Sequence, residues 1–171
     1  MSICGVVKDH YTCLADYPHV RTSATLGDVF AAIAGNREAA DQFRNVLVLD
    51  PADRLIGVLG LHDMLHAVLP DYLKTETPSR YEGADANVAS LAPLWQDDCE
   101  SHCRKMASAP VGDDLTLIDA EVRLDDPLTT AIYLFATHSY NLLPVVEEGR
   151  VIGVLRLVDV VTAVTKAVLH E

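Results

Sequence analysis

The sequence has few positive charges and no cluster of them. Its 171 residues include 13 Lys plus Arg against 25 Asp plus Glu, which gives a formal net charge of −12 at pH 7. The longest basic run is the pair Arg104 and Lys105. A strongly negative chain repels polyanions, so nonspecific binding to nucleic acid or to an anionic membrane surface is excluded. We therefore expect no nucleic-acid partner.

Long hydrophobic runs are also missing. The longest apolar stretch, residues 55–61, is far shorter than the roughly 20 residues that a membrane span requires. Residues 1–4 show no basic stretch leading into an apolar one, as a secretory signal would. We expect no membrane partner and a cytoplasmic location.

Cysteine is scarce, with four residues in the chain. In the absence of a secretory signal, these cysteines predict reduced thiols rather than a disulfide framework. Cys99, His102 and Cys103 share a helix face by their spacing and could hold Zn²⁺, as could a looser N-terminal group of Cys4, His10 and Cys13. Small thiols on a helix face are more often core or interface residues. We therefore assign no metal site.

Nucleophile and phosphate-binding motifs are absent as well. The sequence contains no GxSxG, no P-loop and no GxGxxG. Among pairs formed by its seven histidines, only His62 with Asp63 has a plausible acid–base geometry, and neighbours on a helix face different ways. We expect a protein that is not an enzyme.

A duplicated segment is the most informative feature that is present. Residues 54–68 read RLIGVLGLHDMLHAV and residues 150–164 read RVIGVLRLVDVVTAV, with nine of the fifteen paired positions identical. Chance does not explain this identity, so the chain contains two copies of one unit. An apolar run precedes each copy, at 46–49 and 142–146, and the paired runs predict a β-hairpin in each unit.

An amphipathic helix is predicted upstream of each hairpin. Apolar residues recur at i, i+3, i+4 and i+7 from Leu26 and again from Leu128. Thr25 is placed to cap the first helix. Residues 125–127, two aspartates followed by a proline, are placed to open the second.

Each unit therefore reads helix, strand, strand, helix, and the last helix is predicted to open at Asp63 or Asp159. Strands of nearly continuous Val, Ile and Leu are expected to be covered on both faces. Helices on one face and the sister unit on the other would cover them. Residues 70–90 predict an irregular linker, and residues 91–106 predict a connecting helix that carries Trp95.

These features resemble tandem CBS domains, also called a Bateman module. The resemblance is carried by LPVVEEGRVIGVL followed by LVDVVTAV, by the echo LVLDPADRLIGVL followed by LHDMLHAV, and by the helix before each. It implies an α+β fold in which two pseudo-symmetric CBS units (β-α-β-β-α) pack as a pair around two ligand clefts, with a connecting helical linker. It also implies frequent dimerisation.

The resemblance divides the chain into four parts. Residues 1–19 form an N-terminal segment, residues 20–69 the first CBS domain, residues 70–105 the linker and connecting helix, and residues 106–171 the second CBS domain. Such modules commonly sense AMP, ADP, ATP or S-adenosylmethionine for an attached or partner protein. The implied partners are thus an adenine nucleotide, a second copy of the chain and an unknown effector protein.

The family motif for ribose recognition is incomplete here. In ligand-binding members, a glycine of the last strand is followed by Thr or Ser and then by Asp, at intervals of three residues, and the hydroxyl and carboxylate bind the ribose. Asp63 and Asp159 fall in register, but Gly60 and Arg156 stand at the hydroxyl positions. Two interpretations stay open: a modified ligand site and a degenerate module.

The residues at these positions permit a modified site. A carboxylate at the start of a helix is favoured by the helix dipole and can accept hydrogen bonds from both ribose hydroxyls. Arg156 could bind a phosphate through two parallel hydrogen bonds, or it could instead form a salt bridge with Asp159. Both Asp63 and Asp159 could also cap helices with no ligand present. Of the two clefts, we favour the second, with Asp159 on ribose and Arg156 on phosphate.

The resemblance also places the segment before each hairpin against the adenine. By register this segment contains Phe43, Arg44 and Asn45 in the first copy and Tyr140 and Asn141 in the second. Aromatic faces and amide groups suit a purine, which they can stack on and hydrogen-bond. Core packing and loop solvation explain the same residues without a ligand.

Three functions are therefore compared with the structure below. The first is a regulatory module that binds an adenosine-containing ligand in clefts between its two CBS units. The second is a dimeric interaction scaffold that binds no small ligand. The third is a metal- or redox-responsive sensor built on the cysteine group of residues 99–103.

Overall fold

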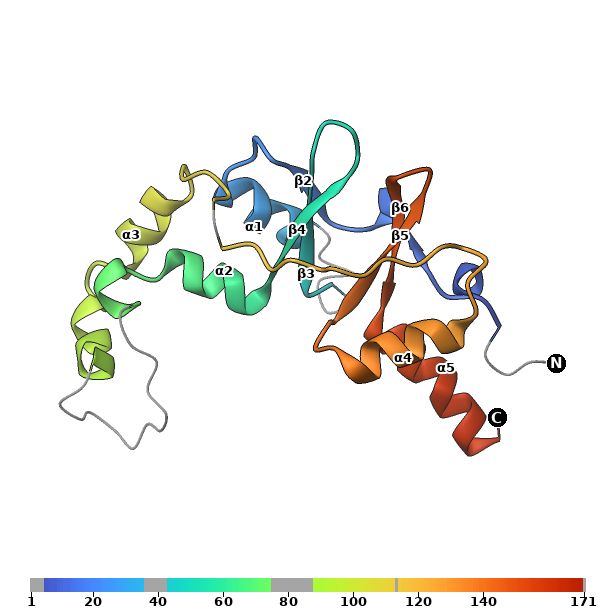
Figure 1. Cartoon of the computed structure of the whole chain (residues 1–171). Coiled ribbons are helices and arrows are strands. Elements are labelled where there is room, and N and C mark those ends of the chain that lie inside the picture. The colour runs from blue at the N-terminus through green and yellow to red at the C-terminus, as the bar shows by residue number, and fades with distance from the viewer. Residues whose placement is uncertain (1–4, 36–42, 75–87, 113, 171) are drawn as a thin grey trace.

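The chain folds into two similar units that lie side by side (Figure 1). The structure is a computed structural model and describes residues 5–35, 43–74, 88–112 and 114–170. Its strands are β1 (Thr12–Cys13), β2 (His19–Arg21), β3 (Asn45–Leu49), β4 (Leu55–Gly60), β5 (Leu142–Glu147) and β6 (Arg150–Arg156). Its α-helices are α1 (Leu26–Ala34), α2 (Leu61–Val68), α3 (Cys99–Met106), α4 (Leu128–Thr137) and α5 (Leu157–Leu169).

The first unit is built on the sheet β2-β3-β4. Strand β2 runs parallel to β3, and β4 runs antiparallel to it. Helix α1 connects β2 to β3 and α2 follows β4, so the order is the β-α-β-β-α order expected from the resemblance. The Thr25 hydroxyl accepts a hydrogen bond from the Asp28 amide at 3.3 Å, and the Asp28 carboxylate accepts one from the Thr25 amide at 2.9 Å. The predicted cap of α1 is confirmed.

The second unit repeats this pattern with a shortened first strand. Strands β5 and β6 form an antiparallel hairpin, and Val122 makes a parallel bridge to Val145 where β2 stands in the first unit. Helix α4 begins directly after Pro127. The prediction that an aspartate caps this helix is wrong, because the Asp126 carboxylate accepts a hydrogen bond from the Arg123 amide at 2.8 Å instead.

Side chains of the strands separate into three hydrophobic cores. In β3, Val46 and Val48 pack toward the helices of their own unit, whereas Leu47 and Leu49 face the other unit. The two-residue period of a strand produces this division. A third core lies between the second sheet and helices α4 and α5. The expectation that helices cover one face of each sheet and the sister unit covers the other is confirmed.

The segment that precedes each unit joins the sheet of the other unit. Strand β1, ahead of the first unit, pairs antiparallel with β6 of the second. Thr116, ahead of the second unit, forms an antiparallel bridge with Val58 of β4. Figure 1 shows the segment around residues 114–124 running across both units. We call these two stretches, residues 5–13 and 114–121, the crossing segments.

Two glycines of the repeat make these crossings possible. A Cβ atom on Gly153 would lie 2.3 Å from the carbonyl oxygen of Thr12, and one on Gly57 would lie 2.9 Å from the Cβ atom of Leu115. Real Cβ atoms do not approach other heavy atoms this closely, so any side chain would push the crossing segment away. The glycine shared by both copies is therefore a packing requirement of the pair.

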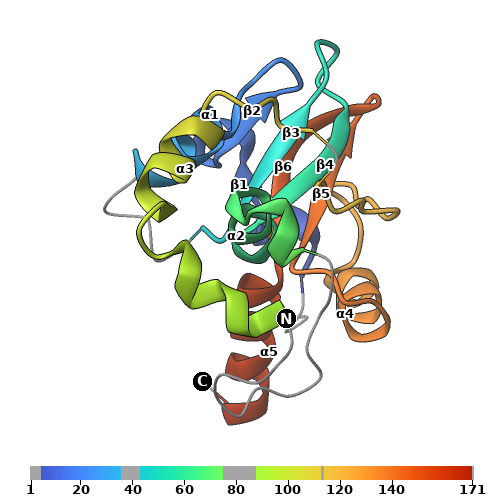
Figure 2. The same cartoon turned by 90° about the vertical axis from the view of Figure 1, so that its left-hand side faces the viewer.

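Over residues 88–106, the connection between the units contains two short helices rather than one. A 3-10 helix covers Val88–Trp95 and α3 follows at Cys99–Met106. The prediction of a single helix over 91–106 is wrong, because Pro93 has no amide hydrogen to continue an α-helical ladder. Helix α3 lies on the side of the first unit that faces away from the second unit (Figure 1), and Figure 2 views the molecule from this side.

Replacing Gly153 with alanine should destabilise the fold, since the new methyl group must displace a backbone carbonyl and the Tyr11 ring. We expect the free energy of unfolding to fall by about 1–3 kcal/mol, measured by urea denaturation. Gly35→Ala is the matched control, because Gly35 is exposed and has a helical φ of −64°. A Gly153→Ala variant as stable as the control would contradict the packing role.

Candidate functional site

The two aspartates of the repeat occupy equivalent places at the starts of two helices. Helices α2 and α5 begin at Leu61 and Leu157, so Asp63 and Asp159 lie in the first turn rather than before it. Here the positive end of the helix dipole favours a carboxylate. The two carboxylates nevertheless have different partners.

Asp63 belongs to a polar group drawn from three segments. Its Oδ2 atom accepts a hydrogen bond from the Gly60 amide at 2.8 Å and another from the Thr116 hydroxyl at 3.2 Å. The first contact is a capping interaction, which the sequence left open as an alternative to ligand binding, and it is made from the third residue of the helix rather than from its start. Thr116 comes from the crossing segment, which lies outside the repeat, and the sequence contains no signal that pointed to it. We call the surroundings of Asp63 the first cleft.

Asp159 is held by the arginine of its own unit. The Arg156 Nε atom donates to Oδ2 at 2.6 Å, and Nη2 donates to Oδ1 at 2.7 Å, so both carboxylate oxygens are engaged. The exposed fractions of the two side chains are 19% for Arg156 and 23% for Asp159. The salt bridge that the sequence left as an alternative is therefore present, and it is half-buried. We call the surroundings of Asp159 the second cleft.

The second cleft also contains aromatic residues of the first unit. The Arg156 guanidinium carbon lies 5.5 Å from the centre of the Phe43 ring, within the range of a cation–π interaction. Tyr17 packs edge-on against Phe43 with ring centres 5.0 Å apart. The second cleft thus combines the helix start of the second unit with the segment before the hairpin of the first.

Tyr17 lies buried in the seam between the units. Burial raises the pKa of its phenol to about 12, against the opposing effects of the Arg156 charge and of a hydrogen bond with Asn45. Asp159 adds a smaller effect that raises the pKa. Tyr17 is hydrogen-bonded to Asn45, which lies beside Gly60, and its pKa responds to the charges of Arg156 and Asp159. It therefore lies between the surroundings of the two aspartates.

The residues expected against the adenine are placed as follows. Asn45 lies at the first residue of β3, with its Oδ1 atom 3.0 Å from where a Gly60 Cβ would stand. The Tyr140 ring stacks on His138, with ring centres 5.1 Å apart, and its hydroxyl accepts a hydrogen bond from the Asp119 amide at 3.4 Å.

Two further residues expected against the adenine are exposed. The side chains of Arg44 and Asn141 both reach solvent. The Asn141 carbonyl oxygen accepts a hydrogen bond from the Leu157 amide at 2.9 Å, which fixes the start of α5. Asn141 is therefore held in position by its backbone, and its side chain is exposed to solvent.

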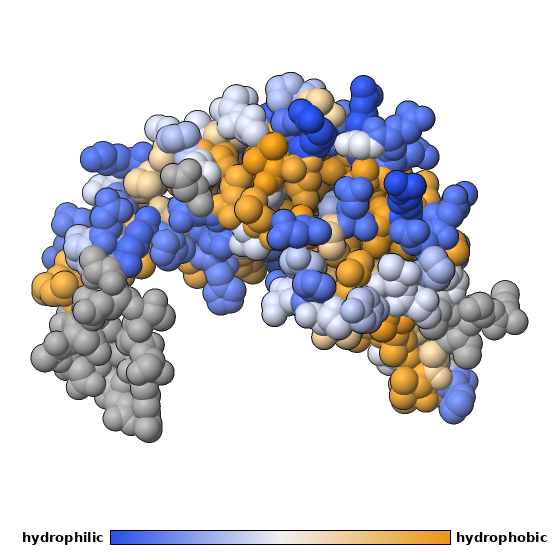
Figure 3. All heavy atoms as spheres, viewed as in Figure 1, coloured by the Kyte–Doolittle hydropathy of each residue, from blue (hydrophilic) through white to orange (hydrophobic). Residues whose placement is uncertain are grey.

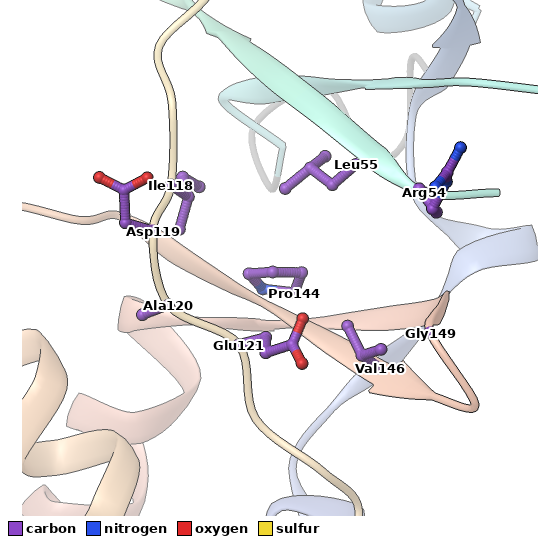
Figure 4. A pocket seen from close by; sticks show the side chains of 9 residues that line it. All are labelled: Arg54, Leu55, Ile118, Asp119, Ala120, Glu121, Pro144, Val146 and Gly149. Atoms are coloured by element: carbon purple, nitrogen blue, oxygen red, sulfur yellow. The ribbon is translucent and has the colours of Figure 1, made fainter.

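A pocket of about 290 Å³ opens farther along the second crossing segment (Figure 4). Its walls come from β4, β5 and residues 118–121, so it lies in the seam between the units. Leu55, Ile118, Pro144 and Val146 provide apolar walls, and Glu121 is among the charged residues that line it. None of the site residues predicted from the sequence lines this pocket.

The cysteine group on α3 is not arranged as a metal site. The His102 ring packs edge-on against Trp95 with ring centres 5.7 Å apart. Burial, and then the neighbouring Cys99 thiol, raise the pKa of Cys103, which disfavours the reactive thiolate. Within the described part of the chain, no three His, Cys, Asp or Glu side chains come together as metal ligands. Cys4 lies outside the described residues.

The fold and the repeated helix starts agree with one family model. Residues 7–70 and 115–166, more than half of the chain, match the CBS domain. The chain belongs to the CBS-domain family. It contains two CBS units in tandem, as the repeat and the resemblance predicted.

Solved structures of CBS-domain pairs share this fold. CBSX2 in complex with AMP aligns with a TM-score of 0.61 at 21% identity, over 95% of this chain and 98% of that one. A CBS domain pair/ACT domain protein from Thermotoga maritima aligns with a TM-score of 0.59 at 24% identity, over 95% and 98% of the two chains. The cytosolic domain of the Mg²⁺ channel MgtE, in complex with ATP, aligns with a TM-score of 0.55 at 22% identity, over 85% of this chain and 44% of that one.

Two further findings concern relatives and helix length. No curated protein matches the chain. Among the helices that the structure describes, none has the length and apolar character needed to cross a membrane.

The buried phenol of Tyr17 should make the protein less stable in alkali. Its pKa is raised from 10.0 to about 12 on folding, so the folded state holds the proton more tightly than the unfolded state does. This contribution is complete below the unfolded pKa and is lost as pH rises toward the folded one. We expect Tyr17→Phe to lose less stability than the wild type as the pH rises from about 10 to about 12, measured by urea denaturation.

Tyr133→Phe serves as the control, since Tyr133 is 65% exposed. It should show the pH dependence of the wild type. Identical pH dependence in the wild type and in Tyr17→Phe would contradict the assignment of a buried, high-pKa phenol to Tyr17.

Proposed function

We propose that this CBS-domain pair is a regulatory module that binds an adenosine-containing ligand in the clefts between its units and transmits the occupancy to a partner protein. The proposal rests on one observation: both units present a carboxylate, Asp63 or Asp159, in the first turn of a helix at the seam. CBSX2 with AMP and the MgtE domain with ATP support a nucleotide as the ligand.

In the first cleft, the proposed roles follow from position. The Asp63 carboxylate binds the ribose hydroxyls, because an ionised carboxylate at a helix start can accept both. Tyr140 and Asn141, from the opposite unit, contact the base. AMP, ADP, ATP and S-adenosylmethionine all present this ribose and base, and they differ in the charge of the 5′ group.

In the second cleft, Asp159 binds ribose and Arg156 binds phosphate. These two side chains are joined by two hydrogen bonds, which a ligand must first break. A phosphate offers Arg156 the same bidentate geometry as the carboxylate it leaves. Arg44 and Asn45, from the first unit, contact the base.

The net charge of −12 sets a further condition on the ligand. A polyphosphate approaches against a repulsive field, so local cations such as Arg44 and Arg156 must compensate it. S-adenosylmethionine carries a cationic sulfonium and meets no such barrier. Because the chain is negatively charged, the charge of the 5′ group is expected to determine which of these ligands binds more tightly.

Ligand binding should raise the melting temperature, because a ligand that binds the native state stabilises it. We expect a dose-dependent shift with at least one of AMP, ADP, ATP and S-adenosylmethionine, measured by differential scanning fluorimetry. Asp63→Asn combined with Asp159→Asn should abolish the shift. Absence of a shift with all four ligands in the wild type would overturn the proposal.

A ligand-free dimeric scaffold is the second candidate. An apolar groove of about 410 Å³ runs between α4 and α5 and is lined by residues that include Phe135, Val161 and Val168. Val161 and Val168 are 52% and 67% exposed in the single chain, and the hydrophobic colouring over α5 is visible in Figure 3. Exposed apolar surface of this kind marks an interface. We propose a second copy of the chain as its occupant, which is compatible with either function.

Val161→Glu should weaken this dimer, because it places a charge in the apolar groove. We expect the molecular mass in solution, measured by light scattering during size-exclusion chromatography, to fall from two chains to one. Thr162→Glu is the matched control, since Thr162 is the next residue of α5 and does not line the groove. A wild-type protein with the mass of one chain would remove the dimer from both candidate functions.

A further inference from the structure

The seam between the two units is closed along one edge and open along the other. At the first edge lie Leu49 of β3 and Val151 of β6, which are 0% and 4% exposed. Their counterparts in the repeat, Val146 and Leu55, lie at the second edge and line the pocket of about 290 Å³. One edge is therefore filled, and the other contains an open apolar space.

A short helical turn covers the closed edge. The 3-10 helix Leu14–Asp16 follows β1 and packs against β6, and Leu14 contacts the core that contains Val151. The equivalent stretch in the second unit is residues 117–121, which follow the bridge at Thr116 and contain no helical turn. The second edge therefore lacks this cover.

A proline keeps the second crossing segment away from its sheet. In the first unit, the Leu47 amide donates a hydrogen bond to the Pro18 carbonyl oxygen at 3.1 Å, which holds the incoming chain against β3. The counterpart of Leu47 is Pro144, which has no amide hydrogen to donate. The backbone contact with β5 therefore begins at Val122, whose amide donates to the Pro144 carbonyl oxygen at 3.0 Å. The pocket opens beside residues 118–121, just before this contact.

The pocket lies at the turn end of the two hairpins. Arg54 and Leu55 line it from the start of β4, and Gly149 lines it from the turn between β5 and β6. Asp63 and Asp159 follow the opposite ends of β4 and β6. The pocket is therefore separate from the two first-turn carboxylates.

A carboxylate borders this apolar space. In Figure 4, the Glu121 carboxylate turns toward the side of Pro144 and Val146, whereas that of Asp119 points away from them. The arginine at the rim, Arg54, donates from Nε to the Asp50 carboxylate at 2.9 Å. The charge of this arginine is thereby partly balanced, and Glu121 is the charged residue that faces the apolar walls.

These surroundings specify the chemistry of an occupant. Apolar walls from three segments favour the burial of a hydrophobic body, and a carboxylate at the mouth attracts a cation. The net charge of −12 also draws cations toward the protein. A volume of about 290 Å³ lies at the lower limit for ligand pockets, so it suits a small molecule rather than a nucleotide.

We propose that this pocket is a binding site for a small organic cation, a primary amine with an aromatic or branched aliphatic body. The body packs among Leu55, Ile118, Pro144 and Val146, and the ammonium group pairs with the Glu121 carboxylate. The site is additional to the proposed nucleotide clefts and does not depend on them.

Phenethylamine is the probe, and two-dimensional amide NMR of the full chain is the measurement. We expect saturable shifts of the amide signals of residues 118–121 and of Gly149, which line the pocket. Hydrocinnamate has the same ring with an anionic group, and methylamine has the cation without the ring. Both should bind more weakly than phenethylamine, because each lacks one of the two contacts.

Glu121→Gln removes the charge at nearly constant shape. It should weaken phenethylamine binding about twofold to fivefold, the effect of losing an exposed ion pair. Asp119→Asn is the matched control, because it changes the net charge equally but the Asp119 carboxylate points away from the apolar walls. It should leave the affinity unchanged. The double variant Asp63→Asn with Asp159→Asn should bind phenethylamine as the wild type does.

Four outcomes would overturn the inference. They are the absence of shifts at residues 118–121, equal affinity for phenethylamine and hydrocinnamate, equal weakening by Glu121→Gln and Asp119→Asn, and loss of binding in the double aspartate variant. The third would mean attraction by the net charge alone, and the fourth would place the amine in the nucleotide clefts. Phenethylamine has neither ribose nor purine, so its binding and the melting-temperature shifts with adenosine ligands succeed or fail independently.

Discussion

The approach of each crossing segment to a glycine of the opposite sheet is the constraint on which the rest of the structure depends. Gly153 and Gly57 leave no room for a Cβ atom, so the segment ahead of each unit can hydrogen-bond to the other unit's last strand. These crossings bind the two sheets into one body, around the shared core of residues such as Leu47 and Leu142. They also carry Thr116 to Asp63.

Pseudo-symmetry in this protein supports two different clefts. The same backbone presents an aspartate in the first turn of α2 and of α5. A single difference in side chain, Gly60 against Arg156, then changes what the aspartate contacts. An arginine within reach takes both oxygens of its carboxylate, since a bidentate charged pair prevails over weaker neutral contacts. The two units of a duplicated module can thus place the same aspartate among different partners.

Prediction from sequence succeeded where a residue acts with its near neighbours in the chain. The cap at Thr25, the hairpins and the order of elements depend on local spacing, and each was found. The single connecting helix was predicted wrongly because helical composition outweighed Pro93. The cap at Asp126 failed because its carboxylate accepts a hydrogen bond from the Arg123 amide instead. The sequence favoured Arg156 as a phosphate ligand, whereas the folded chain places it on Asp159.

The amino-acid sequence by itself determined the architecture of this protein. Its duplication, its apolar strands and its repeated glycine and aspartate require two units that share a core, because strands apolar on both faces must be covered on both. Only the tertiary structure decided how the clefts differ. Thr116 and Tyr17 lie outside the repeat and reach the seam through contacts distant in the chain, and no local pattern encodes such contacts. The Arg156–Asp159 pair is three residues apart and could be named from the sequence, but the Phe43 ring beside its arginine comes from the other unit.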